Sequence, residues 1–265
     1  MHSDAYFVTG KTHHLCEDYA LAGSTICKGS VCHHIMLADG CSTSPHTDVG
    51  ARLVLHCLKR CVEKVFYPDE SQAKTALVMA QTAAETLGLN PQCLDCTILY
   101  GSSPENSSVF SVHFAGDGGV AVRYRDGTIS LYLIEYSESA PEYPNYLVDR
   151  DRYEAYRRFC AERGNLRKKT KFNMWPNGTI TDYNSIPSMT MWNSVTVSKT
   201  ECDIVAVFSD GINTFHGMTA AEVVRELMAF KNVKGEFVKR RMKRFLKTCD
   251  TDFDDDVSMA AIWLD

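Results

Sequence analysis

The chain has 265 residues, 45% of them hydrophobic and 23% charged, which is the composition of a protein that buries an ordinary core. Its formal net charge of −5 disfavours general attraction to nucleic acid, and no apolar run approaches the ~20 residues that cross a bilayer. The opening MHSDAYFVTG lacks the basic start and apolar stretch of a secretory signal, and the 11 cysteines, an odd number, indicate reduced thiols. We therefore expect a cytoplasmic monomer that binds neither nucleic acid nor a membrane.

The first half of the chain predicts strands, a pair of helices and then more strands. Apolar residues recur at every fourth position from Val49 to Val65, which is typical of one face of an amphipathic helix closed by Pro68. The tetrapeptide RDGT at 125–128 predicts a tight hairpin, so the strands on either side of it should be antiparallel. The expected elements are strands at 5–9, 18–26 and 30–37, helices at 48–66 and 72–89, and strands at 96–101, 108–116, 119–125 and 128–136.

The second half begins with an irregular stretch, residues 137–193, which we interpret as an insertion or flap of a single domain. It contains an expected short helix at 151–163 and a basic turn, RKKTK. Thr219 and Glu222 form a capping box that predicts the start of a helix. The remaining expected elements are strands at 194–198, 203–209 and 257–264, and a basic amphipathic helix within 235–249. Because strands and helices are grouped rather than alternating, the order favours an α+β fold built on antiparallel sheets.

Acidic residues stand repeatedly at the ends of predicted strands. Asp39, Asp117 and Asp210 are each followed by glycine, and Glu17 with Asp18 and the run 254–256 lie beside other strands. A turn explains any one Asp-Gly pair, but carboxylates that converge to ~4 Å repel by about 4 kcal/mol at an effective dielectric near 20. Convergence therefore calls for cations, and hard oxygen ligands suit Mg²⁺ or Mn²⁺. Two such ions can activate a water for in-line displacement at phosphorus.

Six segments occur in a recognisable order between about residue 10 and residue 264. They are GKTHHLCEDYAL, MLADGCSTSPHTDVGARL, LDCTILY, FAGDGGVAVR, VFSDGINTF and DDDVSMAAIWL. This ordered set resembles the metal-dependent protein phosphatase superfamily, protein phosphatase type 2C, and its bacterial branch in particular. The resemblance implies a sandwich of two antiparallel sheets flanked by helices, with a metal pair in a cleft at one end. It also implies hydrolysis of phosphoserine or phosphothreonine in phosphoproteins by a metal-activated water, without a covalent phosphoenzyme.

The resemblance also implies roles for individual residues. By position, Asp39 would bridge the two metals, the Gly40 carbonyl would bind one of them, and Asp210 and Asp255 would complete the first metal. The second metal would be served by Asp18.

Two further acids receive secondary roles from the same resemblance. Glu17 is a candidate helper of Asp18. Asp117 matches the aspartate that, with Asp210, can bind a third, looser ion in bacterial members.

Three positions depart from the family pattern. His13 stands where the family has the arginine that holds the substrate phosphate, and histidine is a weaker clamp because it is only partly charged near neutral pH. Cys41 replaces a histidine that some members carry as a candidate general acid, and Gly119 replaces the arginine of Gly-Asp-Ser-Arg. These changes affect substrate affinity and protonation of the leaving group, and they leave every expected metal ligand in place.

Three alternatives follow from the same residues. The missing arginine is compatible with a catalytically weak, metal-binding signalling module that recruits a partner through the 137–193 flap. A metal-dependent nuclease or phosphodiesterase is disfavoured by the acidic charge and by the lack of a basic, aromatic stripe. Zinc is disfavoured because the CHH run, 32–34, lies inside an apparent strand whose neighbouring side chains face opposite ways.

Overall fold

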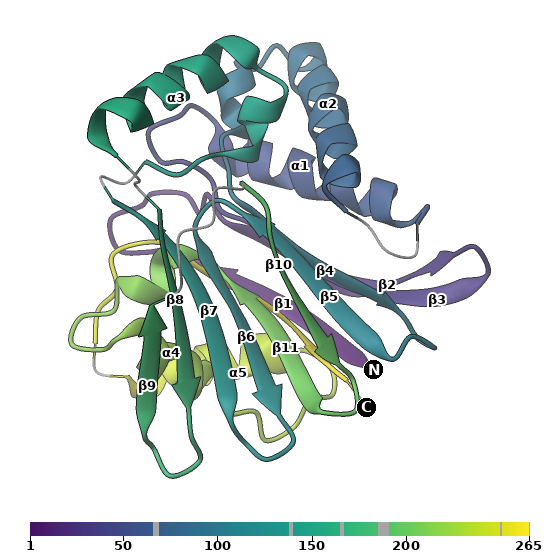
Figure 1. Cartoon of the computed structure of the whole chain (residues 1–265), viewed down its shortest axis with the longest axis vertical. Coiled ribbons are helices and arrows are strands. Elements are labelled where there is room, and N and C mark those ends of the chain that lie inside the picture. Colours follow the sequence, from purple (N-terminus) through teal and green to yellow (C-terminus); the bar gives the residue numbers. More distant parts are fainter. Residues whose placement is uncertain (66–68, 138–139, 165–166, 185–190, 250, 265) are drawn as a thin grey trace.

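The described residues form two antiparallel sheets packed face to face (Figure 1). The computed structural model describes residues 1–265 apart from 66–68, 138–139, 165–166, 185–190, 250 and 265. One sheet has the order β1 (His2–Val8), β12 (Val257–Trp263), β11 (Cys202–Phe208), β6 (Gly118–Tyr124), β7 (Ile129–Tyr136), β8 (Arg167–Met174) and β9 (Ile180–Asn184). The other has the order β10 (Asn193–Ser198), β5 (Val109–Ala115), β4 (Ile98–Pro104), β3 (Ser30–Ala38) and β2 (Tyr19–Cys27).

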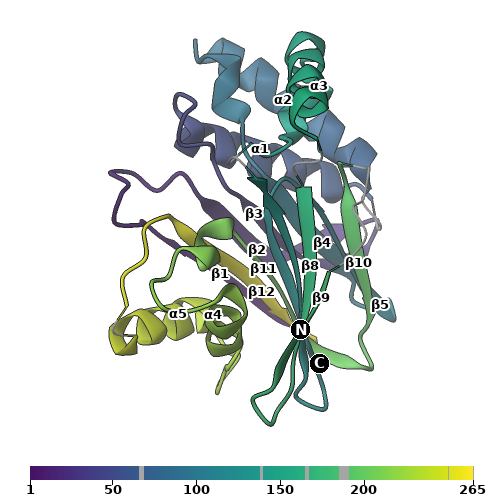
Figure 2. The ribbon, with the colours of Figure 1, turned by 60° about the vertical axis from the view of Figure 1, so that its left-hand side comes forward.

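Helices cover the outer face of each sheet. The pair α1 (Thr47–Val62) and α2 (Glu70–Thr86) packs on the β3 sheet, while α4 (Ala220–Leu227) and α5 (Phe237–Thr248) pack on the β11 sheet (Figure 2). The resulting α-β-β-α layers confirm the predicted α+β sandwich. Among the described residues, no helix is both long and apolar enough to cross a membrane.

The layering explains why the central strands are almost continuously apolar. In β3, Ile35 and Leu37 face the core between the sheets, whereas Met36 faces the helices α1 and α2. The strand β11 behaves in the same way, with Val205 inside the sandwich and Phe208 on the side of α4 and α5. A strand buried on both faces needs apolar residues at successive positions. The apolar runs of β3 and β11 therefore continue to the strand ends, just before the turns that carry Asp39 and Asp210.

The structure corrects the expectation for part of the 137–193 stretch. The predicted helix is present as α3 (Arg150–Arg163), but the basic run RKKTK lies in β8 rather than in a turn. Together β8 and β9 extend the larger sheet beyond β7. On β8, Thr170 and Met174 are buried, while Lys168 forms an ion pair with Glu135 on β7. Of the helix expected at 48–66, α1 ends at Val62, and residues 66–68 lie outside the described part of the chain.

The remaining predicted boundaries shift by a few residues. Helix α2 begins earlier than expected, at Glu70, behind a capping box formed by Asp69 and Gln72. The Thr219–Glu222 capping box is present at the start of α4. The structure also contains two short helical turns, η3 (Pro144–Leu147) and η4 (Asp210–Asn213).

The two sheets bring several strand ends to one edge of the sandwich. The pairings Tyr19 with Ala38, and Phe208 with both Gly119 and Met259, place the ends of β3 and β11 beside the starts of β2, β6 and β12. The acidic residues next to those strand ends therefore gather in one region, although they are far apart in the sequence.

Candidate active site

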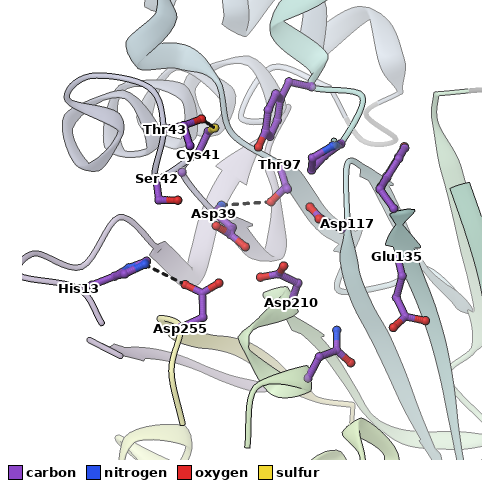
Figure 3. Close-up of a pocket in the computed structure, with 15 residues that line it drawn as sticks. His13, Asp39, Cys41, Ser42, Thr43, Thr97, Asp117, Glu135, Asp210 and Asp255 are labelled. Atoms are coloured by element: carbon purple, nitrogen blue, oxygen red, sulfur yellow. Dashed lines mark hydrogen bonds and ion pairs between the residues drawn. The ribbon is translucent and has the colours of Figure 1, made fainter. Parts of the chain in front are cut away.

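The loops at this edge surround a cavity of about 330 Å³ (Figure 3). Its acidic lining residues are Asp39, Asp117, Glu135, Asp210 and Asp255. Figure 3 shows Asp39, Asp210 and Asp255 turned toward a common space, while the Glu135 carboxylate lies to one side. Among the described lining residues there is no lysine or arginine, and His13 is the one basic side chain. The cavity is therefore strongly acidic.

Backbone pairing fixes the position of Asp39. Its N–H donates to Thr97 Oγ1 at 3.1 Å, and its carbonyl accepts the Thr97 N–H at 2.8 Å. Two residues later, the Cys41 N–H donates to the Asp95 carbonyl at 2.8 Å. The turn after β3 is thus tied to the segment before β4, and the Asp39 carboxylate stands on a rigid mount.

Glycines allow the acidic turns to approach their neighbours closely. A Cβ atom on Gly40 would lie 2.8 Å from Thr47 Cβ and 2.9 Å from the Glu17 carbonyl oxygen. A Cβ atom on Gly211 would lie 1.9 Å from the Asp256 carbonyl oxygen. Real Cβ contacts are never this short, so the glycines are required where the loops touch.

Asp256 joins the first loop of the chain to the last strand. It is 3% exposed and accepts the Gly10 N–H at 2.8 Å and the Glu17 N–H at 2.6 Å. The imidazole of His13 lies between two carboxylates, with Nδ1 3.1 Å from Asp256 Oδ2 and Nε2 3.4 Å from Asp255 Oδ1. The expected phosphate contact, His13, is therefore at the cavity but is held in place by acidic neighbours.

Crowding of the carboxylates raises their pKa values. Burial raises the pKa of Asp39 well above its usual range, and the charges of Asp18, Asp210 and Asp117 raise it further. Burial followed by the Asp255 charge raises the pKa of Asp210 to about 6. Burial and the Asp210 charge likewise raise the pKa of Asp117, and burial raises that of Asp255. Each acid thus resists ionisation while its neighbours are charged.

Asp18 is buried and is not among the residues that line the cavity. It is 1% exposed, and both carboxylate oxygens are buried without a hydrogen-bond partner among the described residues. Burial raises its pKa well above the usual range, and the charges of Asp256 and Asp210 add to that rise. The hydroxyls of Ser209 and Ser258 offset part of it without making a hydrogen bond of good geometry.

The donor set fits a hard divalent cation. Within the described residues, no three Cys, His, Asp or Glu side chains stand at the spacing of a preformed ligand set. However, the cavity offers carboxylate oxygens without a lysine or arginine to neutralise them, and Asp18 has two buried oxygens that lack a partner. Buried carboxylates in this state need a proton or a cation, and oxygen-only donors favour Mg²⁺ or Mn²⁺ over softer metals.

The structure brings most of the predicted site residues together and separates two. The cavity is lined by the predicted residues His13, Asp39, Gly40, Asp117, Asp210 and Asp255. Asp18 is buried and does not line the cavity, and Glu17 lines a neighbouring hollow where its Oε1 accepts the Thr47 hydroxyl at 2.9 Å.

Sequence reasoning missed several features. It did not single out Asp256 within the acidic run, although a residue next to an apolar strand is a candidate for burial. It also overlooked a Cys-x-x-Cys pair, Cys93 and Cys96, which is buried in the core under α1 and α2. Nothing in the sequence indicates that Asp95 forms an ion pair with Arg152, which lies 57 residues away in the chain.

Comparisons with known proteins identify the family of the chain. The family model described as "Protein phosphatase 2C" matches residues 10–247, which confirms the resemblance inferred from the six motifs. No curated protein sequence is detectably similar to the chain.

Solved structures share the fold at low sequence identity. Serine/threonine phosphatase Stp1 from Staphylococcus aureus has a TM-score of 0.55 at 14% identity, with 100% of this chain and 96% of that chain covered. The S. agalactiae serine/threonine phosphatase has a TM-score of 0.54 at 11% identity, with 99% of each chain covered. The catalytic domain of serine threonine protein phosphatase PstP, solved in complex with 2 manganese ions, has a TM-score of 0.52 at 16% identity, with 99% and 98% covered.

Proposed function

The chain belongs to the protein phosphatase 2C family, and from that premise we propose that its Asp39 cavity is the catalytic centre. Family membership confirms the expected class of activity, a metal-dependent protein serine/threonine phosphatase that acts on phosphoproteins. The single observation that carries the assignment of the site is the gathering of Asp39, Asp117, Asp210 and Asp255 around one cavity with raised pKa values.

The first part of the proposal assigns the ligands of two divalent ions, Mg²⁺ or Mn²⁺. Asp39 interacts with both groups of acids: after burial, the charges of Asp18, Asp210 and Asp117 all raise its pKa. That position supports a bridging role for Asp39. Asp210 and Asp255 would hold one ion.

The second part assigns the remaining ligand positions. Asp18 would serve the second ion, since its two buried oxygens have no partner of their own among the described residues. The Gly40 carbonyl would add a backbone ligand beside Asp39, and Asp117 with Asp210 would form a third, weaker position. Glu17 would have a supporting role beside Asp18, because the Glu17 carboxylate already accepts a hydrogen bond from the Thr47 hydroxyl.

Bound divalent ions would supply charge neutralisation and an activated water for attack on phosphorus. The residues of the chain contribute positioning. The Thr97 pairing holds Asp39 in place, and His13 lies at the mouth between the carboxylates of Asp255 and Asp256. Those two carboxylates raise the pKa of His13 although its burial opposes this, so a positive charge is favoured near the substrate phosphate. We propose that this charge takes over part of the task of the missing arginine.

Substitution of the central aspartates tests the proposal. Asp39→Asn and Asp210→Asn should each lower Mn²⁺-dependent hydrolysis of p-nitrophenyl phosphate and of a phosphothreonine peptide by more than about 100-fold. Loss of a residue that only supports a ligand already costs 10- to 100-fold, so loss of a ligand should cost more. Asp182→Asn, on the exposed strand β9, is the matched control and should retain wild-type rates.

The outcomes separate the remaining alternatives. Unchanged hydrolysis in both variants would falsify the assignment of the site. Tight Mn²⁺ binding by the wild type without turnover of the phosphopeptide would instead favour the signalling module.

The partners and compartment remain proposals. The phosphoprotein substrate follows from the family, and a monomer that binds neither nucleic acid nor a membrane is the simplest case. All eleven cysteines are free in the structure, five of them at partly exposed positions, which supports a reducing, cytoplasmic setting.

A further inference from the structure

One wall of the cavity comes from a segment that the catalytic proposal does not use. Residues 140–163, which we call the η3–α3 segment, lie over the strand ends beside α1 and α2 (Figure 1). Pro141 and Tyr143 of this segment line the cavity. Tyr143 lines the cavity together with Cys41, Asp39 and Asp117. The η3–α3 segment therefore forms one wall of the cavity, beside the turn that carries Asp39 and Cys41.

The wall is anchored by a buried carboxylate, Asp95. Its side chain is 2% exposed and meets the Arg152 guanidinium in a two-pronged contact, with Nη1 2.7 Å from Oδ1 and Nη2 2.6 Å from Oδ2. Asn145 Nδ2 donates to Oδ1 at 3.1 Å, and the Ser44 hydroxyl donates to Oδ2 at 2.9 Å. Arg152 also lies over the Tyr146 ring, 5.1 Å from its centroid.

Asp95 also holds the turn after β3 that carries Asp39, which we call the catalytic turn. The Asp95 carbonyl accepts the Cys41 N–H at 2.8 Å, two residues after Asp39, while Gly40 pairs with Cys96 as an isolated bridge. Asp95 therefore faces two ways: its backbone fixes the turn that carries Asp39, and its side chain fixes the η3–α3 segment.

We propose that the Asp95–Arg152 pair is a positioning device that sets substrate selection by holding the Pro141–Tyr143 wall against the catalytic turn. This inference rests on the proposed function of the cavity. A bidentate carboxylate–guanidinium pair has a fixed geometry, so it seats the segment in one orientation. The wall adds contacts to the polypeptide on either side of the phosphorylated residue, and a small phosphate ester has no such flanking chain to be held.

The test compares a large and a small substrate. Arg152→Met keeps an unbranched apolar stem and removes the charge, and Arg152→Lys keeps the charge but cannot form the two-pronged contact. We expect the KM for a phosphothreonine peptide to rise at least tenfold in Arg152→Met and by a smaller factor in Arg152→Lys. We expect kcat/KM for p-nitrophenyl phosphate to stay within about twofold of wild type. Arg158→Met, an exposed position on α3, is the matched control and should change neither.

A variant of the wall itself keeps the test decisive if the Arg152 variants fold poorly. Tyr143→Ala leaves the anchor intact and should reproduce the selective rise in peptide KM. Equal losses on both substrates, or no change on either, would overturn the inference. A wild-type protein that hydrolyses neither substrate would overturn the proposed function instead, so the two failures are distinguishable.

Discussion

Asp18 and Asp95 are equally buried aspartates with opposite surroundings. Each is 1% exposed, but Asp95 has the Arg152 guanidinium, Asn145 and Ser44 as partners, whereas the Asp18 oxygens have none among the described residues. A buried carboxylate without a counter-charge destabilises the fold until a proton or cation neutralises it. The two side chains should therefore affect stability with opposite signs when no metal is present.

We predict that Asp18→Asn stabilises the metal-free protein by about 1–3 kcal/mol, because the neutral amide does not carry the desolvation penalty of a buried carboxylate without a counter-charge. The same change should reduce the extra stability that Mn²⁺ confers, because a ligand is lost. Urea melts in EDTA and in saturating Mn²⁺ measure both effects. A loss of stability in EDTA would contradict the role given to Asp18.

Asp95→Asn is the matched control for this experiment. It should lower stability by about 2 kcal/mol in EDTA and in Mn²⁺ alike, because it breaks a largely buried ion pair. The figure is below that of a fully buried pair, since the Arg152 side chain is 26% exposed and its charge is partly solvated.

At this scale, sequence predicts the acids that follow strands but not their partners. Asp39, Asp117 and Asp210 were found because each ends an apolar run and precedes glycine. The contacts of Asp95 with Arg152 had no such signal, because they depend on how a segment folds back over the sandwich. Local pattern thus locates a residue, while burial and pairing are set by tertiary packing.

Two turns that carry acids of the cavity touch where β11 ends and β12 begins. A Cβ atom on Gly211 would overlap the Asp256 carbonyl at 1.9 Å. Gly211→Ala must push these two turns apart, so we predict a loss of about 1–3 kcal/mol, as for overpacking in a core. Mn²⁺ affinity should fall at least tenfold because Asp210 and Asp255 move relative to each other. Calorimetric titration with Mn²⁺ and thermal melts check the two parts.

A second glycine supplies the comparison. A Cβ atom on Gly23, in the middle of β2, would meet His34 Nε2 at an ordinary 3.5 Å. Gly23→Ala should therefore leave Mn²⁺ affinity unchanged. If both variants bind Mn²⁺ like the wild type, close packing at Gly211 is not what aligns the acids.

Among the elements, β8 shows why a strand was mistaken for a turn. The run RKKTK carries four basic residues in five, a composition typical of exposed turns. In the sheet, Lys171 lies over the Tyr132 ring, 5.2 Å from its centroid, and Lys168 faces Glu135. Cross-strand partners on β7 thus accommodate the charges, and those partners are visible only once the strands are paired.

For the whole molecule, local hairpins were predictable and the order of the strands was not. The pairing of β6 with β7 follows from the RDGT turn, whereas β1 pairs with β12 from the opposite end of the chain. No periodicity in one segment identifies a partner some 250 residues away. The layered sandwich could be expected from the resemblance. The core between the sheets and the cores between each sheet and its helices then follow from the alternation of side chains along β3 and β11.

The stability of the whole fold should also depend on His34, buried in β3 at 2% exposure. Burial, with smaller effects from the charges of Lys59 and His33, lowers its pKa to about 4. The unfolded chain, with a histidine pKa near 6.5, therefore binds more protons than the folded chain between about pH 4 and pH 6.5. The folded state is fully favoured above pH 6.5 and loses this contribution, about 3 kcal/mol in all, as the pH falls to 4.

His34→Gln removes the titrating group and isolates this effect. The difference in unfolding free energy between wild type and variant should shift by about 3 kcal/mol in favour of the variant between pH 7 and pH 4. The acids of the cavity have the opposite pH dependence, since the raised pKa of Asp210 makes the metal-free fold lose stability as the pH rises toward 6. These acids contribute equally to both proteins, so their effect cancels in the difference. Urea melts of both proteins in EDTA at several pH values measure the difference, and a value independent of pH would show that His34 is not buried in its neutral form.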